Sequence, residues 1–217
     1  MIAMILAAGR GERLRPITEE CPKALVEVRG RSLLERHLDN VRAAGIDTVV
    51  INLGWLGEQI EDRVGSGRPY GLNVIYSPEG DNILETGGGI HRALPLLGSE
   101  PFLVINADVF TDMALPPAGL LEHDAGHLVL VPTPAHKDRG DFDLDGDRVI
   151  ESAKPALTFS GVAIYRPEFF GGCEAGRFPL APMLKSAAHA GQLGGSLYEG
   201  AWEDVGTPDR LAELNRC

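Results

Sequence analysis

The sequence predicts an α/β fold with a mixed sheet, on two observations. In the first half of the chain, short apolar runs alternate with segments whose apolar residues recur at helical spacing. This pattern is typical of parallel βαβ units with right-handed crossovers. In the second half, a turn signal between alternating residues indicates an antiparallel hairpin. A chain of 217 residues that is 44% hydrophobic and 24% charged is long enough to bury the core of one such domain.

The first half is predicted to contain four strands and three helices. A strand over residues 2–6 ends at a glycine-bearing turn. Ser32 is suited to cap a helix whose apolar residues recur from Leu33 to Ala44, and Gly45 is suited to end it. A Val-Val-Ile run predicts a buried strand over 48–52. The remaining elements are a helix over 55–64, a strand over 73–76, a loop over 77–89, a helix over 90–97 and a strand over 102–106.

The second half is predicted to mix strands with two more helices. We expect a strand over 127–131, a hairpin over 143–150 that turns at Asp145-Gly146, and a strand over 157–165. Pro182 lies near the start of a predicted helix over 179–190, and Thr207 is a good cap for a last helix over 208–215. No low-complexity linker and no internal repeat divides the chain, so one domain with an inserted antiparallel portion is expected over 1–217.

Charge and cysteine content limit the classes of partner. A formal net charge of −11 argues against nucleic acid or an anionic membrane. No apolar run approaches the ~18–20 residues of a membrane helix. Cys21, Cys173 and Cys217 are widely spaced and form no CxxC pair, which disfavours a disulfide framework or a zinc site and favours a reducing cytoplasm. We expect small-molecule partners, and the sequence leaves a monomer and a small homo-oligomer both open.

Residues 6–23, LAAGRGERLRPITEECPK, predict an anion site. A glycine-bearing turn follows an apolar strand, where backbone N–H groups bind phosphates in open α/β sheets. Gly9 and Gly11 permit close approach of a ligand and a positive φ. The motif is not the dinucleotide fingerprint, because Leu14 occupies the third glycine position, and no Gly-Lys-Ser/Thr follows as in a Walker loop. The alternative is a tight turn with solvated arginines. Residues 1–31 hold six Lys and Arg (Arg10, Arg13, Arg15, Lys23, Arg29, Arg31) against four Glu, in a chain with 20 basic and 31 acidic residues.

Three charged residues are the candidates for chemistry. Lys23 is presented by Pro22 from a constrained stretch, and its ammonium is suited to a phosphoryl group that gains charge in the transition state; the alternative is a surface lysine. Asp108 follows the buried FLVIN run, and Asp204 lies between an aromatic residue and a glycine turn. Two carboxylates that converge on phosphate oxygens suit Mg²⁺. The alternative for Asp204 is a cap or turn residue.

Two weaker signals concern the rest of a substrate. Gly87, Gly88 and Gly89 open a predicted helix, and their bare backbone is suited to a flat base or a sugar; the alternative is a flexible loop. The stretches 139–141 and 158–161 lie in the second half, where we expect an acceptor substrate.

These residues together resemble the signature of the sugar-1-phosphate nucleotidyltransferases, L-A-A-G-x-G-x-R-L-x-P-x-T followed by P-K. The segments at 106–108 and 203–207 also fall where that family keeps its two Mg²⁺ ligands. Within the family the chain is most similar to the small N-acetylmuramate α-1-phosphate uridylyltransferases of cell-wall recycling, in INLGWLGEQIED, YSPEG, LETGGGI, LTFSG and the WEDVGT ending. The resemblance implies a Rossmann-like (GT-A-like) fold: a mixed, mainly parallel sheet with helices on both faces and a small antiparallel insertion.

The resemblance also implies a role for individual residues. Residues 1–112 would form the nucleotide-binding half and 113–217 the sugar-phosphate-binding half. Lys154 lies in Ser-Ala-Lys-Pro, where many relatives have Glu-Lys-Pro, so it is either a sugar-phosphate contact or a loop lysine. The implied catalytic residues are Lys23 and Arg13; the nucleotide-binding residues are Ala7, Ala8, Gly9, Gly11, Glu12, Arg13, Lys23, Gly87, Gly88 and Asn106; the sugar-phosphate residues are Gly140, Asp141, Ser160 and Lys154; and the Mg²⁺ ligands are Asp108 and Asp204.

The implied reaction is Mg²⁺-dependent transfer of a nucleotidyl group from an NTP to a sugar 1-phosphate, with release of pyrophosphate. UTP and N-acetylmuramate α-1-phosphate are the leading substrates. The alternatives are a hexose-1-phosphate enzyme that uses dTTP or GTP, and a nucleotide-sugar-binding module without turnover.

Overall fold

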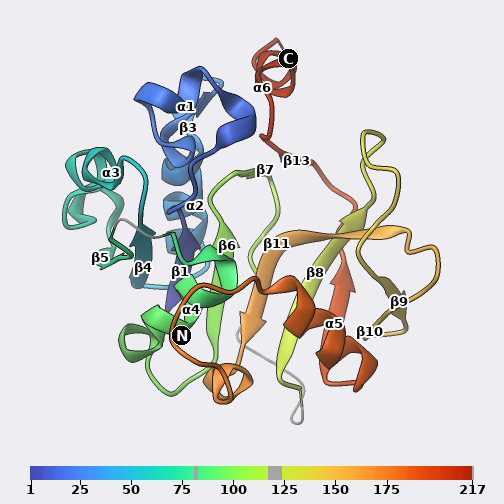
Figure 1. Ribbon diagram of the computed structural model, residues 1–217. Coiled ribbons are helices and arrows are strands. Elements are labelled where there is room, and N and C mark those ends of the chain that lie inside the picture. Colours follow the sequence, from blue (N-terminus) through green and yellow to red (C-terminus); the bar gives the residue numbers. More distant parts are fainter. Residues whose placement is uncertain (81–82, 117–123, 217) are drawn as a thin grey trace.

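The computed structural model describes residues 1–80, 83–116 and 124–216. Its main feature is a sheet in which the described strands follow the order β5-β4-β1-β6-β11-β8-β12-β10-β9 (Figure 1). Following the pairings from β1 outward, every strand of this sheet runs in the same direction except β11 and β10. The predicted mixed, mainly parallel sheet is therefore confirmed. The strands are β1 (Ala3–Leu6), β4 (Thr48–Leu53), β5 (Asn73–Pro78), β6 (Phe102–Asn106), β8 (Gly126–Pro132), β9 (Asp143–Asp145), β10 (Arg148–Ile150), β11 (Leu157–Tyr165) and β12 (Leu193–Leu197).

Helices cover both faces of this sheet, as predicted. Side chains alternate along each strand, so Ile5 and Met4 of β1 belong to two different apolar clusters. Helices α2 (Leu33–Ala43) and α3 (Gly57–Val64) pack on the face of Ile5. Helices α4 (Glu85–Leu97) and α5 (Ala181–His189) pack on the face of Met4. Burial on both sides explains why β1, β4 and β6 read as continuous apolar runs.

The order of the strands reverses at β1. The chain moves from β1 to β4 and then β5 on one side, and returns to β6 on the other side of β1. The segments that leave the carboxyl ends of these strands therefore diverge, and a crevice opens between them. Crevices of this kind are where open α/β sheets bind ligands.

Smaller elements lie beside this crevice. The segment after the glycine turn forms the short helices η1 (Glu12–Leu14), α1 (Ile17–Glu20) and η2 (Lys23–Leu25), and then the hairpin of β2 (Glu27–Val28) and β3 (Arg31–Ser32). Strands β7 (Val109–Thr111) and β13 (Trp202–Asp204) form an antiparallel ribbon that leads into α6 (Pro208–Leu214). Within the described part of the chain, no helix is long and apolar enough to cross a membrane.

One segment corrects the sequence prediction. Residues 77–89 were expected to form a loop, but β5 extends to Pro78 and α4 begins at Glu85. The glycines of α4 are buried because another segment packs against them. A Cβ at Gly87 would lie 2.5 Å from the Phe178 ring, and one at Gly88 would lie 2.2 Å from the carbonyl oxygen of Gly176. Tertiary contact therefore outweighs the low helix propensity of glycine here.

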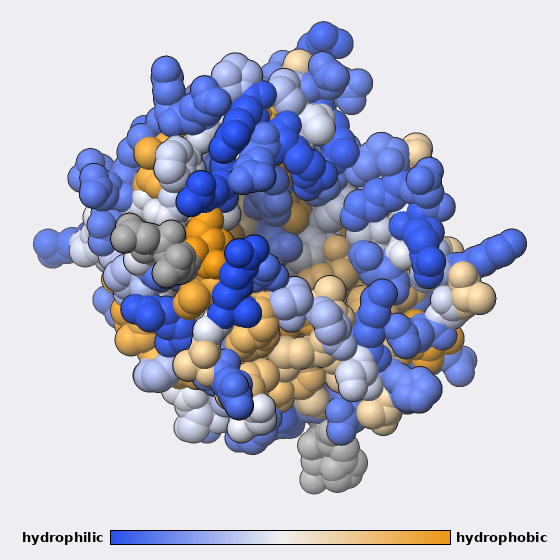
Figure 2. Space-filling view, in the orientation of Figure 1, coloured by the Kyte–Doolittle hydropathy of each residue, from blue (hydrophilic) through white to orange (hydrophobic). Residues whose placement is uncertain are grey.

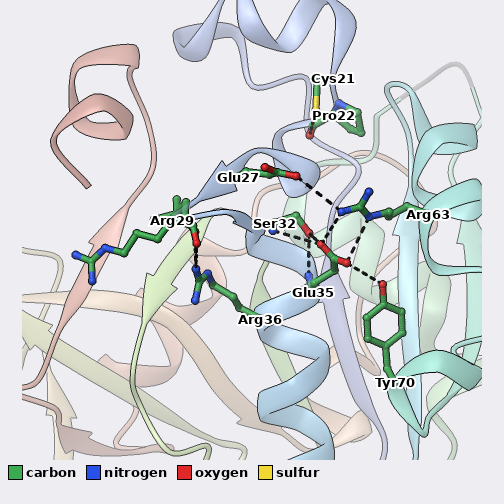
Figure 3. A network of polar contacts seen from close by, with 10 residues as sticks. Cys21, Pro22, Glu27, Arg29, Ser32, Glu35, Arg36, Arg63 and Tyr70 are labelled. Carbon is green, nitrogen blue, oxygen red and sulfur yellow. Dashed lines mark hydrogen bonds and ion pairs between the residues drawn. The ribbon is translucent and has the colours of Figure 1, made fainter. Parts of the chain in front are cut away.

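A polar network holds the start of α2 against α3 (Figure 3). Ser32 and Glu35 form a capping box: the Ser32 hydroxyl accepts a hydrogen bond from the Glu35 N–H at 3.2 Å. The Glu35 carboxylate accepts further bonds from Arg63 of α3 at 3.1 Å and from the Tyr70 hydroxyl at 3.1 Å. Partial burial raises the pKa of Glu35, but the hydrogen bonds from Arg63, Ser32 and Tyr70 outweigh this effect and lower it to about 2.

Glu35→Gln should therefore lower the free energy of unfolding at pH 7 by about 1–2 kcal/mol, because the hydrogen bonds of the native state stabilise the charged carboxylate. A carboxylate with a lowered pKa stabilises the fold above its ordinary pKa of 4.5, and this contribution disappears as the pH falls towards about 2. The difference between variant and wild type should shrink over that range. Urea denaturation at several pH values measures it, with exposed Glu58→Gln as control. A difference that is the same at pH 7 and pH 3 would contradict this role.

Candidate active site

A cavity of about 210 Å³ lies at the carboxyl ends of β1, β4 and β6. Its walls come from the segment after β1, the end of β4, the segment between β5 and α4, and the end of β6. Most of the nucleotide-binding residues expected next to β1 and β6 meet here. The lining residues are Leu6, Ala7, Ala8, Gly9, Lys23, Ala24, Asn52, Glu79, Ile83, Glu85, Thr86, Asn106, Ala107 and Asp108.

A wider, open cavity of about 1040 Å³ adjoins the first and shares Gly9, Lys23, Ile83 and Asp108 with it. Four cationic side chains line it against two acidic ones, so its surface is basic in a chain whose net charge is −11. Figure 2 shows the face of the molecule hollowed near its centre, with hydrophilic residues above the hollow and an apolar area below it. The lining residues of the wide cavity are Gly9, Arg10, Gly11, Glu12, Arg13, Lys23, Ile83, Leu84, Asp108, Gly176, Arg177 and Gly206.

The two glycines of the turn after β1 have different roles. Gly11 has φ 62, and its carbonyl oxygen accepts a hydrogen bond from the Thr18 hydroxyl at 2.8 Å. A Cβ at this position would lie 2.8 Å from Thr18 Cγ2. The fold itself therefore requires glycine at 11. A Cβ at Gly9 would meet no atom within 4 Å, and Gly9 lines both cavities. Its missing side chain leaves room for a ligand.

Lys23 and Asp108 form an ion pair that joins the segment after β1 to the end of β6. Lys23 Nζ donates to Asp108 Oδ2 at 2.5 Å, and both residues line both cavities. The Lys23 side chain is 14% exposed and that of Asp108 33%, so both remain accessible to a ligand. Nearby His37 of α2 carries no charge at neutral pH, because burial lowers its pKa to about 4 against the opposing effect of Asp108.

Asp204 approaches Asp108 through the backbone. Asp204 pairs with Val109 in the β7–β13 ribbon, and the Val205 N–H donates to the Asp108 carbonyl oxygen at 2.9 Å. The Asp204 carboxylate, however, bonds to the Arg210 guanidinium and lies 3.4 Å from His136 Nε2. It lines neither cavity. The structure thus places Asp108, directly before β7, beside the end of β13, where Asp204 lies, and each carboxylate pairs with a cation.

Arg13 lines the wide cavity close to Gly206, the glycine that follows β13. Its guanidinium and that of Arg210 both flank Gly206: a Cβ there would lie 3.4 Å from Arg13 Cζ and 3.3 Å from Arg210 Nη1. Glycine at 206 therefore allows two arginines to approach the segment after β13.

Sequence reasoning missed a buried pair, Asn52 and Glu79, which are 3% and 6% exposed. The Ala7 N–H donates to Asn52 Oδ1 at 2.7 Å, and Asn52 Nδ2 donates to Glu79 Oε1 at 2.6 Å. The other oxygen of Glu79 accepts the Leu84 N–H at 2.7 Å. The pair therefore ties the end of β1 to the start of α4 across the small cavity. The sequence did contain a signal for Asn52: β4 and β6 both contain Val-Ile-Asn near their carboxyl ends, so Asn52 occupies the same position in β4 as Asn106 does in β6.

Arg177 and Glu85 were also missed, since their segments lie far apart in the chain. Arg177 Nε donates to Glu85 Oε1 at 2.7 Å, and Glu85 has φ 62, which is rare for a residue with a side chain. The ion pair joins the rim of the wide cavity to the wall of the small one.

The residues expected at the sugar phosphate lie outside both cavities. Gly140 is buried against Leu157 and Thr133. Asp141 accepts the Phe159 N–H at 3.0 Å, and Lys154 is exposed. The Ser160 hydroxyl is fully buried and accepts the Val162 N–H at 3.1 Å. Gly87 and Gly88 likewise lie inside α4 and not at the cavity wall.

The bulge that contains Ser160 nevertheless reaches the site. The register of β11 against β8 shifts between Phe159 and Ala163, and Gly161 has φ 82. A Cβ at Gly161 would lie 2.7 Å from Asn106 Nδ2, and the Ser160 carbonyl oxygen accepts Trp202 Nε1 at 2.9 Å. The bulge therefore connects the end of β6 to β13.

Several known proteins are similar to this chain in sequence or in fold. Residues 3–140 match the family of the MobA-like NTP transferase domain. An N-acetylmuramate alpha-1-phosphate uridylyltransferase from Neisseria meningitidis serogroup B is 50% identical over 222 residues, covering 98% of this chain and 96% of that protein. The protein of that name from Caulobacter vibrioides is 36% identical over 235 residues, covering 98% and 97%. A solved structure from Bacillus anthracis, described as a glucose-1-phosphate thymidylyltransferase, shares the fold, with TM-score 0.88 over 100% of this chain and 94% of its own, at 20% identity.

The two glycines of the turn should respond differently to substitution. Gly11→Ala should lower the free energy of unfolding by about 1–2 kcal/mol, because alanine is strained at positive φ and its Cβ would meet Thr18. Gly9→Ala should stay within about 0.5 kcal/mol of wild type. Urea denaturation of both variants measures the difference, and equal losses would show that Gly9 is also required by the fold.

Proposed function

We propose that this protein transfers a uridylyl group from UTP to N-acetylmuramate α-1-phosphate. The chain belongs to the MobA-like NTP transferase family and is a sugar-1-phosphate nucleotidyltransferase. The observation that carries this proposal is the pair of adjoining cavities at the point where the strand order reverses, one small and one wide and basic. The choice of sugar and base rests on the 50% identity to a uridylyltransferase of that specificity over nearly the whole chain.

In this proposal the nucleotide spans both cavities. Its base occupies the small cavity, against the backbone of Ala7 and Ala8 and beside Asn106. Its phosphates pass Gly9, whose missing side chain leaves space, and enter the wide cavity. Glu12, Arg13 and Lys23 line that cavity, where Arg13 and Lys23 offset the negative charge of the phosphates.

The chemistry is an in-line displacement. An oxygen of the sugar 1-phosphate attacks the α-phosphorus of UTP and forms a new P–O bond. The bond between the α-phosphorus and the bridging oxygen breaks, and its electron pair leaves with pyrophosphate. No general base is needed, because a phosphate nucleophile is already ionised near pH 7. Catalysis therefore depends on positioning and on the cations of Lys23 and Arg13.

Asp108 and Asp204 are the residues that would hold Mg²⁺. Carboxylate oxygens are the ligands that Mg²⁺ prefers, Asp108 lines both cavities, and the hydrogen bond between Val205 and Asp108 keeps Asp204 next to it. When bound, the ion would offset charge on the phosphate oxygens. Lys23 and Arg210 pair with the two carboxylates in this structure, and Lys23, which lines both cavities, is placed to contact a phosphate.

The sugar phosphate is expected to enter from the side of Asp141, Gly140 and the β11 bulge. Free thiols at Cys21 and Cys173 are in keeping with a cytoplasmic enzyme. The alternatives remain a hexose-1-phosphate enzyme with dTTP or GTP, and a binding module without turnover. The joint presence of Lys23, Asp108 and Asp204 counts against the module.

A substrate matrix tests the proposal. Four NTPs are combined with several sugar 1-phosphates and Mg²⁺, and pyrophosphate release is measured. UTP with N-acetylmuramate α-1-phosphate should be among the best pairs. A stronger hexose pair would replace the substrate assignment, and the absence of pyrophosphate with every pair would support the binding module.

Asp108→Asn should lower kcat on the order of 10²–10³-fold, because the amide removes the charge that binds the metal while keeping the shape. Steady-state rates at several Mg²⁺ concentrations measure the loss, and circular dichroism checks the fold. Asp62→Asn, on the exposed side of α3, is the matched control and should behave as wild type. Near-normal turnover of Asp108→Asn would refute the metal role of Asp108.

A further inference from the structure

Trp55 holds both ends of the glycine loop. It lies in the turn between β4 and α3 and lines neither cavity. Its backbone N–H donates to the carbonyl oxygen of Ala8 at 3.3 Å, and its indole Nε1–H donates to the carbonyl oxygen of Thr18 at 2.9 Å. One residue from a different element therefore ties down the segment 8–18 at its start and at its end.

The backbone around Trp55 is shaped for this contact. A Cβ at Gly54 would lie 2.5 Å from the carbonyl oxygen of Ala8, so only glycine lets the turn come this close. Leu56 has φ 54, a left-handed conformation that is uncommon for a residue with a branched side chain. An unfavourable backbone conformation that presents a half-exposed tryptophan indicates a use for that side chain.

The Arg10 side chain lies over the ring of Trp55. The Arg10 guanidinium carbon lies 5.5 Å from the centroid of the Trp55 ring. Among the residues that the structure describes, Arg10 forms no ion pair, whereas Lys23 and Arg177 pair with Asp108 and Glu85. A carboxylate would neutralise the charge of a guanidinium, whereas an aromatic face orients the guanidinium and leaves its charge in place. The Arg10 guanidinium is thus oriented by the ring, and its charge remains available to an anionic ligand.

The position of Arg10 indicates which phosphates of the nucleotide would lie next to it. Lys23 lines both cavities and therefore lies at their junction, while Arg10 lines only the wide one. With the base in the small cavity, the α-phosphate would lie near the junction. The β- and γ-phosphates would lie further into the wide cavity, near Arg10.

We propose that Arg10, oriented by Trp55, binds the β- and γ-phosphates of the nucleotide and the pyrophosphate that leaves. This inference rests on the proposed function. Arg10 then offsets the charge that the bridging oxygen gains when its bond to the α-phosphorus breaks. Trp55 is a positioning residue, because it acts through Arg10 and through the loop.

Binding measurements test the role of Arg10. Isothermal titration with inorganic pyrophosphate, UTP and UMP, each with Mg²⁺, compares Arg10→Ala with wild type. Pyrophosphate and UTP should bind about tenfold more weakly to the variant, while UMP, which lacks the β- and γ-phosphates, should change less than about twofold. Arg15→Ala is the matched control from the same loop, since Arg15 is exposed and lines neither cavity. Equal losses for UTP and UMP, or no loss, would overturn the proposal.

A double-mutant cycle tests the role of Trp55. Trp55→Leu should weaken pyrophosphate binding in wild type but have little further effect in Arg10→Ala, because its contribution passes through Arg10. Trp55→Phe keeps an aromatic face and should lie between Trp55→Leu and wild type. Additive losses would show that Trp55 supports the loop independently of Arg10.

Tryptophan fluorescence gives a readout that needs no turnover. Pyrophosphate should change the emission of wild type, and this change should be absent in Trp55→Phe, which retains only Trp202. If wild type binds neither UTP nor pyrophosphate, the proposed function and this inference both fail. If wild type binds both and Arg10→Ala binds them equally well, only this inference fails.

Discussion

The parallel pairing of β1 with β4 on one side and β6 on the other is the constraint on which the rest of the structure depends. It sends the following segments in opposite directions and leaves a crevice lined by strand ends. Polar groups exposed there must find partners. The structure provides them in two bridges across the crevice: Asn52 with Glu79, and Lys23 with Asp108. The first ties β1 to the start of α4, and the second ties η2 to the end of β6.

Charge in this crevice is balanced in advance. Each of the two carboxylates expected to hold a metal already pairs with a cation, Lys23 or Arg210. In the proposed function, a substrate that brings phosphates and Mg²⁺ would exchange these partners and would add few unpaired charges. Arg10 is arranged differently, since its neighbour is the face of Trp55 and not an acid. An acidic protein can thus keep a locally basic cavity without leaving its cations disordered.

The order of elements was predictable because it follows from local patterns. Ser32 and Gly45 bound α2 as expected, and the hairpin turns at Gly146 with φ 59. Strand β12 was missed, because LGGSL lacks the β-branched residues that mark a strand and is stabilised by pairing with β8. The start of α4 was misplaced for a related reason. Its glycines read as a loop, while their packing against residues 176–178 makes them helical.

The sequence by itself determined the reaction class and predicted the anion site, because Gly9, Gly11, Arg13 and Lys23 lie within one short signature. Only the tertiary structure decided how that signature is used. It showed that Gly11 serves the turn while Gly9 leaves space, and that Asp204 meets Asp108 through a ribbon. It also showed that Asn52 and Glu79 line the small cavity, that Arg177 lines the wide one, and that Trp55 contacts the glycine loop. The physical reason is that ion pairs, hydrogen bonds and close approach depend on distance in space, which spacing along the chain does not record.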